Sequence, residues 1–260
     1  MGVFRTSRSD HKKDNALRPI LSRSAFDRFD ERILGLGDIN KSAEPVDAIC
    51  IVYDLEGFTA FSRQVDPHLA VPHFMSRFLS WLFAELKRRY FREEVEGGVK
   101  LYARLPFFAK FMGDGVMFLW DTKDLPRGSL TNIPMIANII SESYKRDFAP
   151  QMSREFSDVP RKLRVGVARG RVFAVGGGSD YVGPCINIAS RLQKIGSTIR
   201  FCMAKRGWSA DEVIVDENNR EIFVLKSVPI RGIGETELVY IERKEYDQLP
   251  VDEKVLFRDP

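Results

Sequence analysis

Residues 111–120 read FMGDGVMFLW, an apolar run in which one carboxylate, Asp114, stands between two glycines. Because an Asp-Gly pair tolerates the positive φ angles of tight turns, the flanking runs, about 100–112 and 116–121, are predicted to be the strands of a hairpin. Two interpretations of Asp114 follow. It is either an ordinary turn residue or a metal ligand held at the tip of a rigid ribbon.

Strand and helix patterns interleave along the rest of the chain. Residues 46–54, VDAICIVYD, are rich in β-branched residues and predict a buried strand that stops at Asp54. Helices are predicted from Ser24 (SAFDRFDERILGLGD), after Gly57, from Pro72 to Glu96, from Ile133 to Phe148 and from Asn187 to Lys194. Residues 162–177 predict a strand, a glycine turn and a second strand, and EIFVLKSV and LVYIERK predict late strands. We therefore expect an α/β (α+β) sandwich, a mixed sheet with helices packed on it.

Composition limits the classes of protein to consider. The 260 residues are enough for one sizeable domain plus an extension, and 44% hydrophobic with 29% charged residues is typical of a soluble globular chain. No segment approaches the roughly 18 consecutive apolar residues of a membrane span. The polar start does not resemble a secretory signal. The three cysteines are odd in number and widely spaced, which favours reduced thiols in a cytoplasmic protein.

The first 24 residues hold six Lys and Arg against two Asp, a local charge of 6 − 2 = +4 that equals the net charge of the chain. Such an arm is typical of a solvated terminus, although it is also able to touch nucleic acid or anionic lipid. Because no basic patch with interleaved aromatic residues follows, nucleic acid is not an expected partner, and neither is a membrane.

Two short segments each place a carboxylate beside a glycine turn. These are DLEGFT (54–59) and KFMGD (110–114). Two aspartates a few ångströms apart repel one another unless a hard cation lies between them. Asp54 and Asp114 are therefore candidate ligands for Mg²⁺ or Mn²⁺ in complex with a nucleoside triphosphate. The alternative is structural, since an aspartate that ends a strand is commonly a helix cap.

A third segment, DYVGPCINIASR (180–191), adds a carboxamide and a guanidinium. Asn187 and Arg191 are four residues apart, so a helix presents both on one face. These groups suit the charge and positioning needs of a pentavalent phosphate. The alternative is an exposed helix face with ordinary ion pairs.

Together the three segments resemble the catalytic domain of the class III adenylate/guanylate cyclases, over about Val46 to Tyr240. The resemblance rests on an Asp–aliphatic–x–Gly–Phe–Thr motif, a Lys–x–x–Gly–Asp motif and a Gly–x–x–Ile–Asn–x–Ala–Ser–Arg motif, here residues 54–59, 110–114 and 183–191. It implies a ferredoxin-like palm fold. It also implies three regions, namely a basic arm with a short helix (1–45), a catalytic domain (46–245) and a C-terminal tail (246–260).

The resemblance further implies a head-to-tail homodimer with two composite sites. In each site, two Mg²⁺ or Mn²⁺ ions are held by one subunit through Asp54, Leu55 and Asp114, while Asn187 and Arg191 come from the other. Phosphate contacts fall to Gly57, Phe58, Thr59 and Arg231. The 3′-hydroxyl attacks its own α-phosphate, which releases pyrophosphate and a 3′,5′-cyclic nucleotide. One departure concerns the Lys-Gly-Lys-Gly segment of adenylate-type enzymes, where this chain has Arg231 and Ile233 in the lysine positions.

Two lines of reasoning lead to different bases. Lys110 with Asp180 matches the family's adenine pattern. Three other features, however, resemble the pyrimidine cyclases of Pycsar antiphage defence: the basic arm, the segment RFDERILGL and the segment VYDLEGFTAFSRQ. Those cyclases activate an effector through cyclic UMP or cyclic CMP. A pyrimidine pocket needs shortening by bulky side chains, and the candidates are Tyr53, Arg104, Phe111 and Tyr181. We expect a uridylate cyclase that makes cUMP from UTP, with cytidylate and adenylate cyclases as alternatives.

Two other classes of function stay open. One is a degenerate cyclase-fold module that senses nucleotides without turnover, although such modules usually lose a metal aspartate. The other is a different phosphoryl-transfer enzyme with paired aspartates. The Asn–x–Ala–Ser–Arg segment and the absence of a Gly-Gly-Asp/Glu-Glu-Phe loop argue against it.

Overall fold

The computed structural model describes residues 7–8, 19–20, 34–36, 38, 42–63, 66–95, 99–103, 105–123, 125, 127–208, 222–230, 232 and 236–260. For residues 7–8, 19–20, 91–95, 99–103 and 127–129 it describes the backbone alone. The short helix predicted from Ser24 falls almost wholly outside these residues, as do Arg104 and Arg231.

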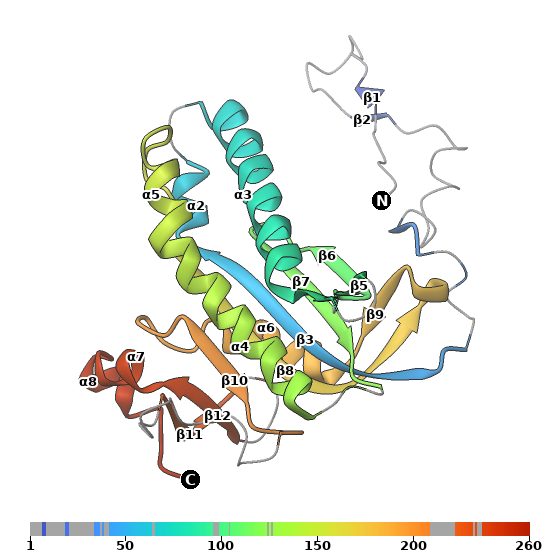
Figure 1. The fold of residues 1–260 in the computed structure, drawn as a ribbon. Helices are drawn as coiled ribbons and strands as arrows, with labels where there is room; N and C mark the ends of the chain where they lie inside the picture. Colours follow the sequence, from blue (N-terminus) through green and yellow to red (C-terminus); the bar gives the residue numbers. More distant parts are fainter. Residues whose placement is uncertain are drawn as a thin grey trace. The chain divides into compact units, whose positions relative to one another are not determined.

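The chain divides into two compact units. The larger comprises Val46–Arg171 and Gly183–Pro260, and the smaller comprises Met1–Pro45 and Val172–Val182. The larger unit is built on a mixed sheet in the order β11-β12-β10-β8-β3-β7-β6 (Figure 1). These strands are Phe223–Pro229, Thr236–Glu242, Phe201–Ala204, Lys162–Val175, Pro45–Glu56, Gly115–Asp121 and Phe108–Phe111, respectively.

Parallel and antiparallel neighbours both occur in this sheet. β10 runs parallel to β8, while β12 is antiparallel to β10 and β11, and β7 is antiparallel to β3 and β6. The predicted hairpin around Asp114 is confirmed as the β6–β7 pair. The expected mixed α/β sheet with packed helices is confirmed as well.

Two long helices cover one face of the sheet, α3 (Pro67–Tyr90) and α4 (Arg127–Ser143), which lie side by side in Figure 1. α4 continues through a π-helical turn, Tyr144–Phe148, into α5 (Ala149–Met152). Alternate residues of β3 face these helices, namely Ile49, Ile51, Tyr53 and Leu55, and all four are buried. Because side chains alternate across a strand, Cys50, Val52 and Asp54 face the opposite side.

The opposite face of the sheet carries α6 (Pro184–Leu192). A Cβ atom at Gly166 of β8 would lie 2.0 Å from the carbonyl oxygen of Ala189, so the helix backbone rests directly on this glycine. Cys185, Ile188 and Leu192 form the buried side of α6. The three cysteines of the chain are buried free thiols.

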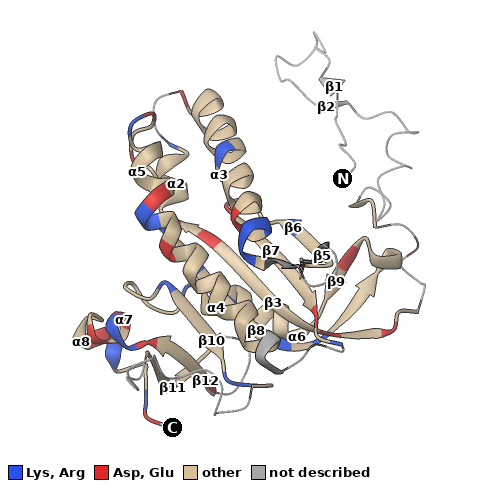
Figure 2. Cartoon of the chain, viewed as in Figure 1, with Lys and Arg blue, Asp and Glu red and all other residues tan. Residues whose placement is uncertain are grey.

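The C-terminal residues pack against the β11 edge of the sheet. α7 (Arg243–Asp247) and α8 (Val251–Lys254) carry residues of both charge signs (Figure 2). Phe257 is buried, and the main chains of Ser227 and Arg258 exchange two hydrogen bonds of 2.8 and 2.9 Å.

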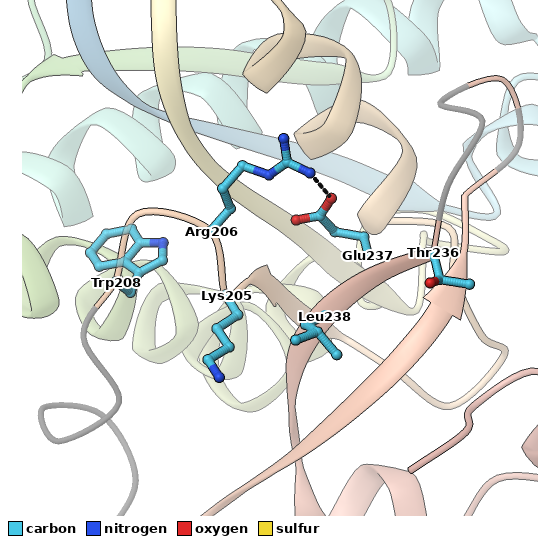
Figure 3. A pocket seen from close by; sticks show the side chains of 6 residues that line it. All are labelled: Lys205, Arg206, Trp208, Thr236, Glu237 and Leu238. Atoms are coloured by element: carbon cyan, nitrogen blue, oxygen red, sulfur yellow. Dashed lines mark hydrogen bonds and ion pairs between the residues drawn. The ribbon is translucent and has the colours of Figure 1, made fainter. Parts of the chain in front are cut away.

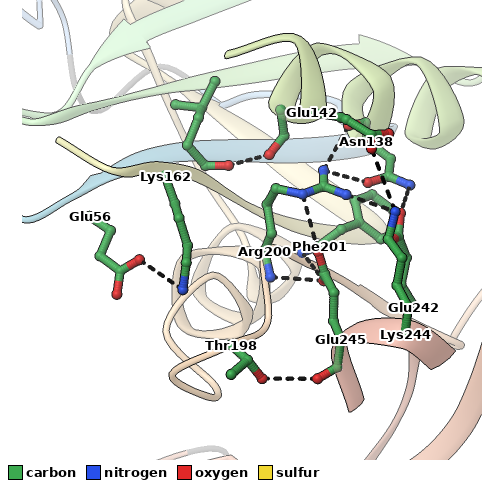
Figure 4. A network of polar contacts seen from close by, with 12 residues as sticks. Glu56, Asn138, Glu142, Lys162, Thr198, Arg200, Phe201, Glu242, Lys244 and Glu245 are labelled. Atoms are coloured by element: carbon green, nitrogen blue, oxygen red, sulfur yellow. Dashed lines mark hydrogen bonds and ion pairs between the residues drawn. The ribbon is translucent and has the colours of Figure 1, made fainter. Parts of the chain in front are cut away.

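A buried ionic network connects α7 with β12, with the start of β10 and with α4 (Figure 4). The guanidinium of Arg200, which is 5% exposed, lies 3.0 Å from the Glu242 carboxylate and 3.1 Å from that of Glu245. It also donates to the side-chain oxygen of Asn138 on α4 at 2.7 Å. Because one guanidinium serves three elements, the network fixes β10, β12 with α7, and α4 to one another.

The smaller unit contains the far end of β8, which pairs with β9 (Asp180–Val182) across a 3₁₀ turn at Gly176–Gly178. Its other described strands are the short pair β1 (Ser7–Arg8) and β2 (Pro19–Ile20). A glycine turn was predicted within residues 162–177. β8 instead passes through Gly170 without a break, and the chain turns only at Gly176.

Other element boundaries differ from expectation. α3 begins at Pro67 and ends at Tyr90, where the predicted helix ran to Glu96. The next residues form a separate hairpin of β4 (Phe91–Val95) and β5 (Val99–Ala103), so the predicted strand at 100–112 is two strands. β10 was not predicted at all. Among the described helices, none combines the length and apolar character needed to cross a bilayer.

Candidate active site

The pairing of β3 with β7 brings Asp54 and Asp114 together. Asp54 lies opposite Gly115 in the register, and the Leu55 N–H donates to the Asp114 carbonyl at 3.2 Å. A Cβ atom at Gly115 would lie 2.1 Å from the Tyr53 carbonyl oxygen, so a residue without a side chain is required there. Gly113 turns the chain with a φ of 92°. Figure 2 shows acidic positions at this end of β3, where the chain enters α2 (Phe58–Phe61).

Asp54 is a buried carboxylate with two cations beside it. Its side chain is only 6% exposed. One oxygen, Oδ1, lies 3.7 Å from the Lys194 amine, and the other, Oδ2, lies 3.6 Å from the Arg164 guanidinium. Burial raises the pKa of Asp54 above its usual value, and the nearby Asp114 charge adds to this, while Lys194 and Arg164 oppose it.

The chemistry of these donors fits a divalent ion that is shared with a ligand. Within the described ranges, no group of three or more His, Cys, Asp or Glu residues gathers into a self-contained metal cage. Mg²⁺ is commonly held by one or two carboxylates together with substrate phosphates, and a pair of aspartates supplies that share. Leu55, the third predicted ligand, buries its side chain in the core, so its main-chain carbonyl is its only oxygen donor.

The predicted phosphate-binding residues 57–59 follow Asp54 after a tight turn. Gly57 has a φ of 89°, and its carbonyl accepts hydrogen bonds from the N–H groups of Ala60 and Phe61 at 3.0 and 3.1 Å. Phe58 is half-buried against Phe61, while Gly57 and Thr59 are exposed. The turn therefore places the main chain of residues 57–59 close to Asp54 in the sequence, at the end of β3.

Asn187 and Arg191 lie one turn apart on α6, and both are exposed. The Arg191 guanidinium lies against the turn at Gly232, where a Cβ atom would be 3.1 Å from its Nη1. Within one chain, therefore, the described ion pairs of Asp54 are with Lys194 and Arg164, and Arg191 faces a different element. Sequence reasoning missed Lys194 and Arg164. The signals available were the position of Lys194 three residues after Arg191 and the strand alternation that puts Arg164 on the same face as Gly166.

Two of the predicted base-binding residues fall in different units of the chain. Lys110, on β6, belongs to the larger unit, and Asp180, at the start of β9, belongs to the smaller one. The Asp180 carboxylate accepts a hydrogen bond from the Tyr181 N–H at 2.8 Å. Phe111 is 51% exposed beside the hairpin tip, so its ring is open to a ligand.

Tyr53 was predicted to contact the base, and the structure corrects this. Its ring is fully buried and packs edge-on against Phe118 at 6.0 Å between centroids. Position 53 shares the core-facing side of β3 with Ile51 and Leu55, so the ring packs in the core and lines no base pocket. Burial raises the pKa of its hydroxyl, which meets no hydrogen-bond partner among the described residues.

Two cavities lie near the end of the sheet that holds β11 and β12. One, of about 540 Å³, is lined by Ser190, Arg191, Lys194, Ile195, Val228, Pro229, Ile230 and Leu256. The other, of about 360 Å³, is lined by Lys205, Arg206, Trp208, Thr236, Glu237 and Leu238 (Figure 3). In the second cavity Arg206 is already paired with Glu237 at 3.0 Å. The first cavity alone includes a predicted site residue, Arg191.

Comparisons with known proteins give structural matches. A scan against protein-family models and a search of curated protein sequences gave no match. Among solved structures, the guanylyl cyclase Cya2 matches with a TM-score of 0.56 at 13% identity, over 78% of this chain and 94% of that one. The adenylyl cyclase CyaB from P. aeruginosa matches with a TM-score of 0.56 at 13% identity, over 78% and 96%.

A bacterial light-regulated adenylyl cyclase matches with a TM-score of 0.50 at 14% identity, over 81% of this chain and 58% of that one. At these identities the likeness establishes the fold alone. The chain has the fold of class III nucleotidyl cyclase catalytic domains.

Proposed function

We propose that this protein is a nucleotidyl cyclase that converts a nucleoside triphosphate, UTP in our assignment, into its 3′,5′-cyclic monophosphate and pyrophosphate. The observation that carries the proposal is the convergence of Asp54 and Asp114 at the end of the β3–β7 pair, in a chain with the cyclase fold. A helix that exposes Asn187 and Arg191 supplies the remaining groups.

The cyclisation needs orientation more than acid–base chemistry, because nucleophile and electrophile belong to one molecule. The O3′–phosphorus bond forms as the hydroxyl proton passes to solvent and the bond from the α-phosphorus to the α,β-bridging oxygen breaks, so that this oxygen leaves with pyrophosphate. Two divalent ions held by Asp54, Leu55 and Asp114 would lower the pKa of the attacking hydroxyl and neutralise charge on the reacting phosphate. Arg191 donates to the phosphate oxygens where charge develops, and Asn187 orients the ribose.

We infer that two copies of the chain supply this arrangement. Within one chain the Asp54 carboxylate meets Lys194 and Arg164, whereas the Arg191 guanidinium lies against Gly232. A head-to-tail homodimer allows the acids of one subunit to face Asn187 and Arg191 of the other. Each dimer then has two equivalent sites.

The choice of UTP rests on the hydrogen-bonding groups that the family resemblance assigns to the base. Lys110 would supply a donor and Asp180 an acceptor, which match uracil O4 and N3–H. Phe111 exposes half of its ring at the hairpin, where it can shorten the pocket to the length of a pyrimidine. The same lysine–aspartate pair also favours adenine, so ATP is the second candidate.

We further propose that the product is a second messenger in antiphage defence, acting on a separate effector protein. The support for this role is the likeness of residues 52–64 to pyrimidine cyclases.

One assay tests the function. The full chain is incubated with Mn²⁺ and ATP, GTP, CTP or UTP in separate reactions, and products are identified by mass and chromatography. We expect cUMP from UTP as the main product. Main production of cAMP would keep the cyclase and reject the uridylate assignment, whereas four intact triphosphates would reject the cyclase.

A further inference from the structure

The carboxylate of Asp54 is held between two cations of very different character. Arg164 projects from β8, and its side chain is 18% exposed. Its Nε is buried without a hydrogen-bond partner among the described residues. Lys194 lies two residues beyond Leu192, the last residue of α6, and its side chain is 58% exposed. Arg164 is therefore fixed in place by its strand, whereas the Lys194 amine sits on a flexible four-carbon stem at the surface.

A buried carboxylate needs compensation as long as no metal is bound. Asp54 is almost entirely removed from solvent, and the Asp114 charge lies nearby. An unpaired charge in such a place is costly, and each oxygen of Asp54 meets one cation within 4.0 Å. Lys194 supplies one of these two positive charges at the oxygen Oδ1.

A cavity next to the Lys194 side chain offers the amine a second position. This side chain lines the cavity of about 540 Å³ together with Ser190 and Arg191. Because the Lys194 side chain is 58% exposed and borders both Asp54 and this cavity, the cavity offers space for the amine when it leaves the carboxylate.

We propose that Lys194 is an exchangeable counter-ion of Asp54, which a divalent ion displaces and which thereby sets the affinity of the site for metal. The inference rests on the proposed function only in taking Asp54 as a metal ligand. The charge on Lys194 opposes an incoming cation of charge +2, while Arg164 stays in place and keeps Asp54 partly compensated. Lys194 is therefore a residue, from the same subunit as the acids, that lowers metal affinity.

The test measures the affinity of the nucleotide-free full chain for Mn²⁺. Electron paramagnetic resonance reports the concentration of the free ion during the titration. Lys194→Gln removes the charge, and we expect Mn²⁺ to bind about tenfold more tightly, a change of about 1.4 kcal/mol. Lys194→Arg keeps the charge and should retain the wild-type affinity. Lys162→Gln is the matched control, because the Lys162 amine lies 3.3 Å from Glu56 and does not pair with Asp54.

Each outcome decides the question. Unchanged or weaker Mn²⁺ binding in Lys194→Gln would overturn the inference and make the contact an ordinary surface ion pair. An equal gain in Lys162→Gln would do the same, since it would indicate a general charge effect. If Asp54→Asn leaves wild-type Mn²⁺ binding intact, the metal assignment within the proposed function fails instead. Thermal unfolding of each variant confirms that the proteins compared are folded.

Discussion

Gly115 faces the main-chain carbonyl of Tyr53 so closely that a Cβ atom would lie 2.1 Å from that oxygen. The absence of a side chain allows β7 to pair with β3 this closely, and that pairing keeps Asp114 beside Asp54. The contact is with backbone on both sides, so no side-chain rotation relieves it.

Replacing this glycine should therefore separate the two strands. We expect Gly115→Ala to lower the free energy of unfolding by about 3 kcal/mol, since overpacking against backbone forces the sheet to shift. Gly113→Ala is the control, because nothing lies within 4 Å of its Cβ position and only its φ of 92° is unfavourable. We expect about 1 kcal/mol there. Urea denaturation measures both, and a larger loss at residue 113 would contradict the packing account.

The Arg200 network should be among the most sensitive polar features of the fold. Arg200→Met leaves Glu242 and Glu245 buried without their guanidinium, and we expect a loss of about 3–5 kcal/mol in unfolding free energy. Arg77→Met breaks an exposed ion pair with Glu155, with side chains 53% and 40% exposed, and should cost less than about 1 kcal/mol. Equal losses in the two variants would show that burial does not govern these pairs.

Glu242 gives this network a defined pH dependence. Burial alone would raise its pKa, but the Arg200 charge and the Asn138 and Lys244 contacts outweigh this and lower it below the usual 4.5. A carboxylate whose pKa is depressed by folding stabilises the fold above its unfolded pKa and loses that contribution as the pH falls through the folded value. The stability lost in Glu242→Gln should thus be largest above about pH 5 and shrink in more acidic buffer.

Glu245 supplies the opposite sign as an internal comparison. Burial raises its pKa, and Arg200 only partly offsets that effect. Folding therefore favours its protonated form, and the stability of the wild type relative to Glu245→Gln should rise as the pH falls. Unfolding midpoints measured between about pH 3 and pH 7 test both variants. Parallel trends in the two would contradict the assigned pKa directions.

The two acids should be needed for turnover and dispensable for folding. Asp54→Asn and Asp114→Asn each remove a proposed metal ligand at similar side-chain volume, so we expect a loss of at least about 100-fold in cyclic nucleotide formation. Asp47→Asn is the matched control on the same strand, since its side chain is 64% exposed and pairs with Arg171. Full turnover in either acid variant would remove that residue from the site.

Much of this architecture can be predicted from local pattern. The Gly-Asp-Gly turn predicted the β6–β7 pair, and the run before Asp54 predicted β3, because turn chemistry and buried strands leave strong local signals. The class of fold followed from three short motifs, although the solved structures reported above are only 13–14% identical to this chain.

Other features depend on contacts that are distant in the sequence. Gly170 predicts a turn by itself, but β8 is paired within the sheet both before and after this residue and stays extended through it. Tyr53 follows the core-facing alternation of β3, so packing decides its environment, although its position next to Asp54 predicted a role in the site. Lys194 and Arg164 reach Asp54 from the segment after α6 and from β8, and the spacing and strand alternation that place them become informative only once the sheet order is known.

The composite site is tested most directly by a heterodimer of two inactive chains. Asp54→Asn and Arg191→Ala are co-expressed with different tags, and the mixed dimer is isolated by tandem purification. If the acids of one subunit work with Asn187 and Arg191 of the other, this dimer has one intact site and should form cyclic nucleotide at about half the wild-type rate, while both parent homodimers are inactive. A mixed dimer as inactive as its parents, or an Arg191→Ala homodimer with full turnover, would contradict the account.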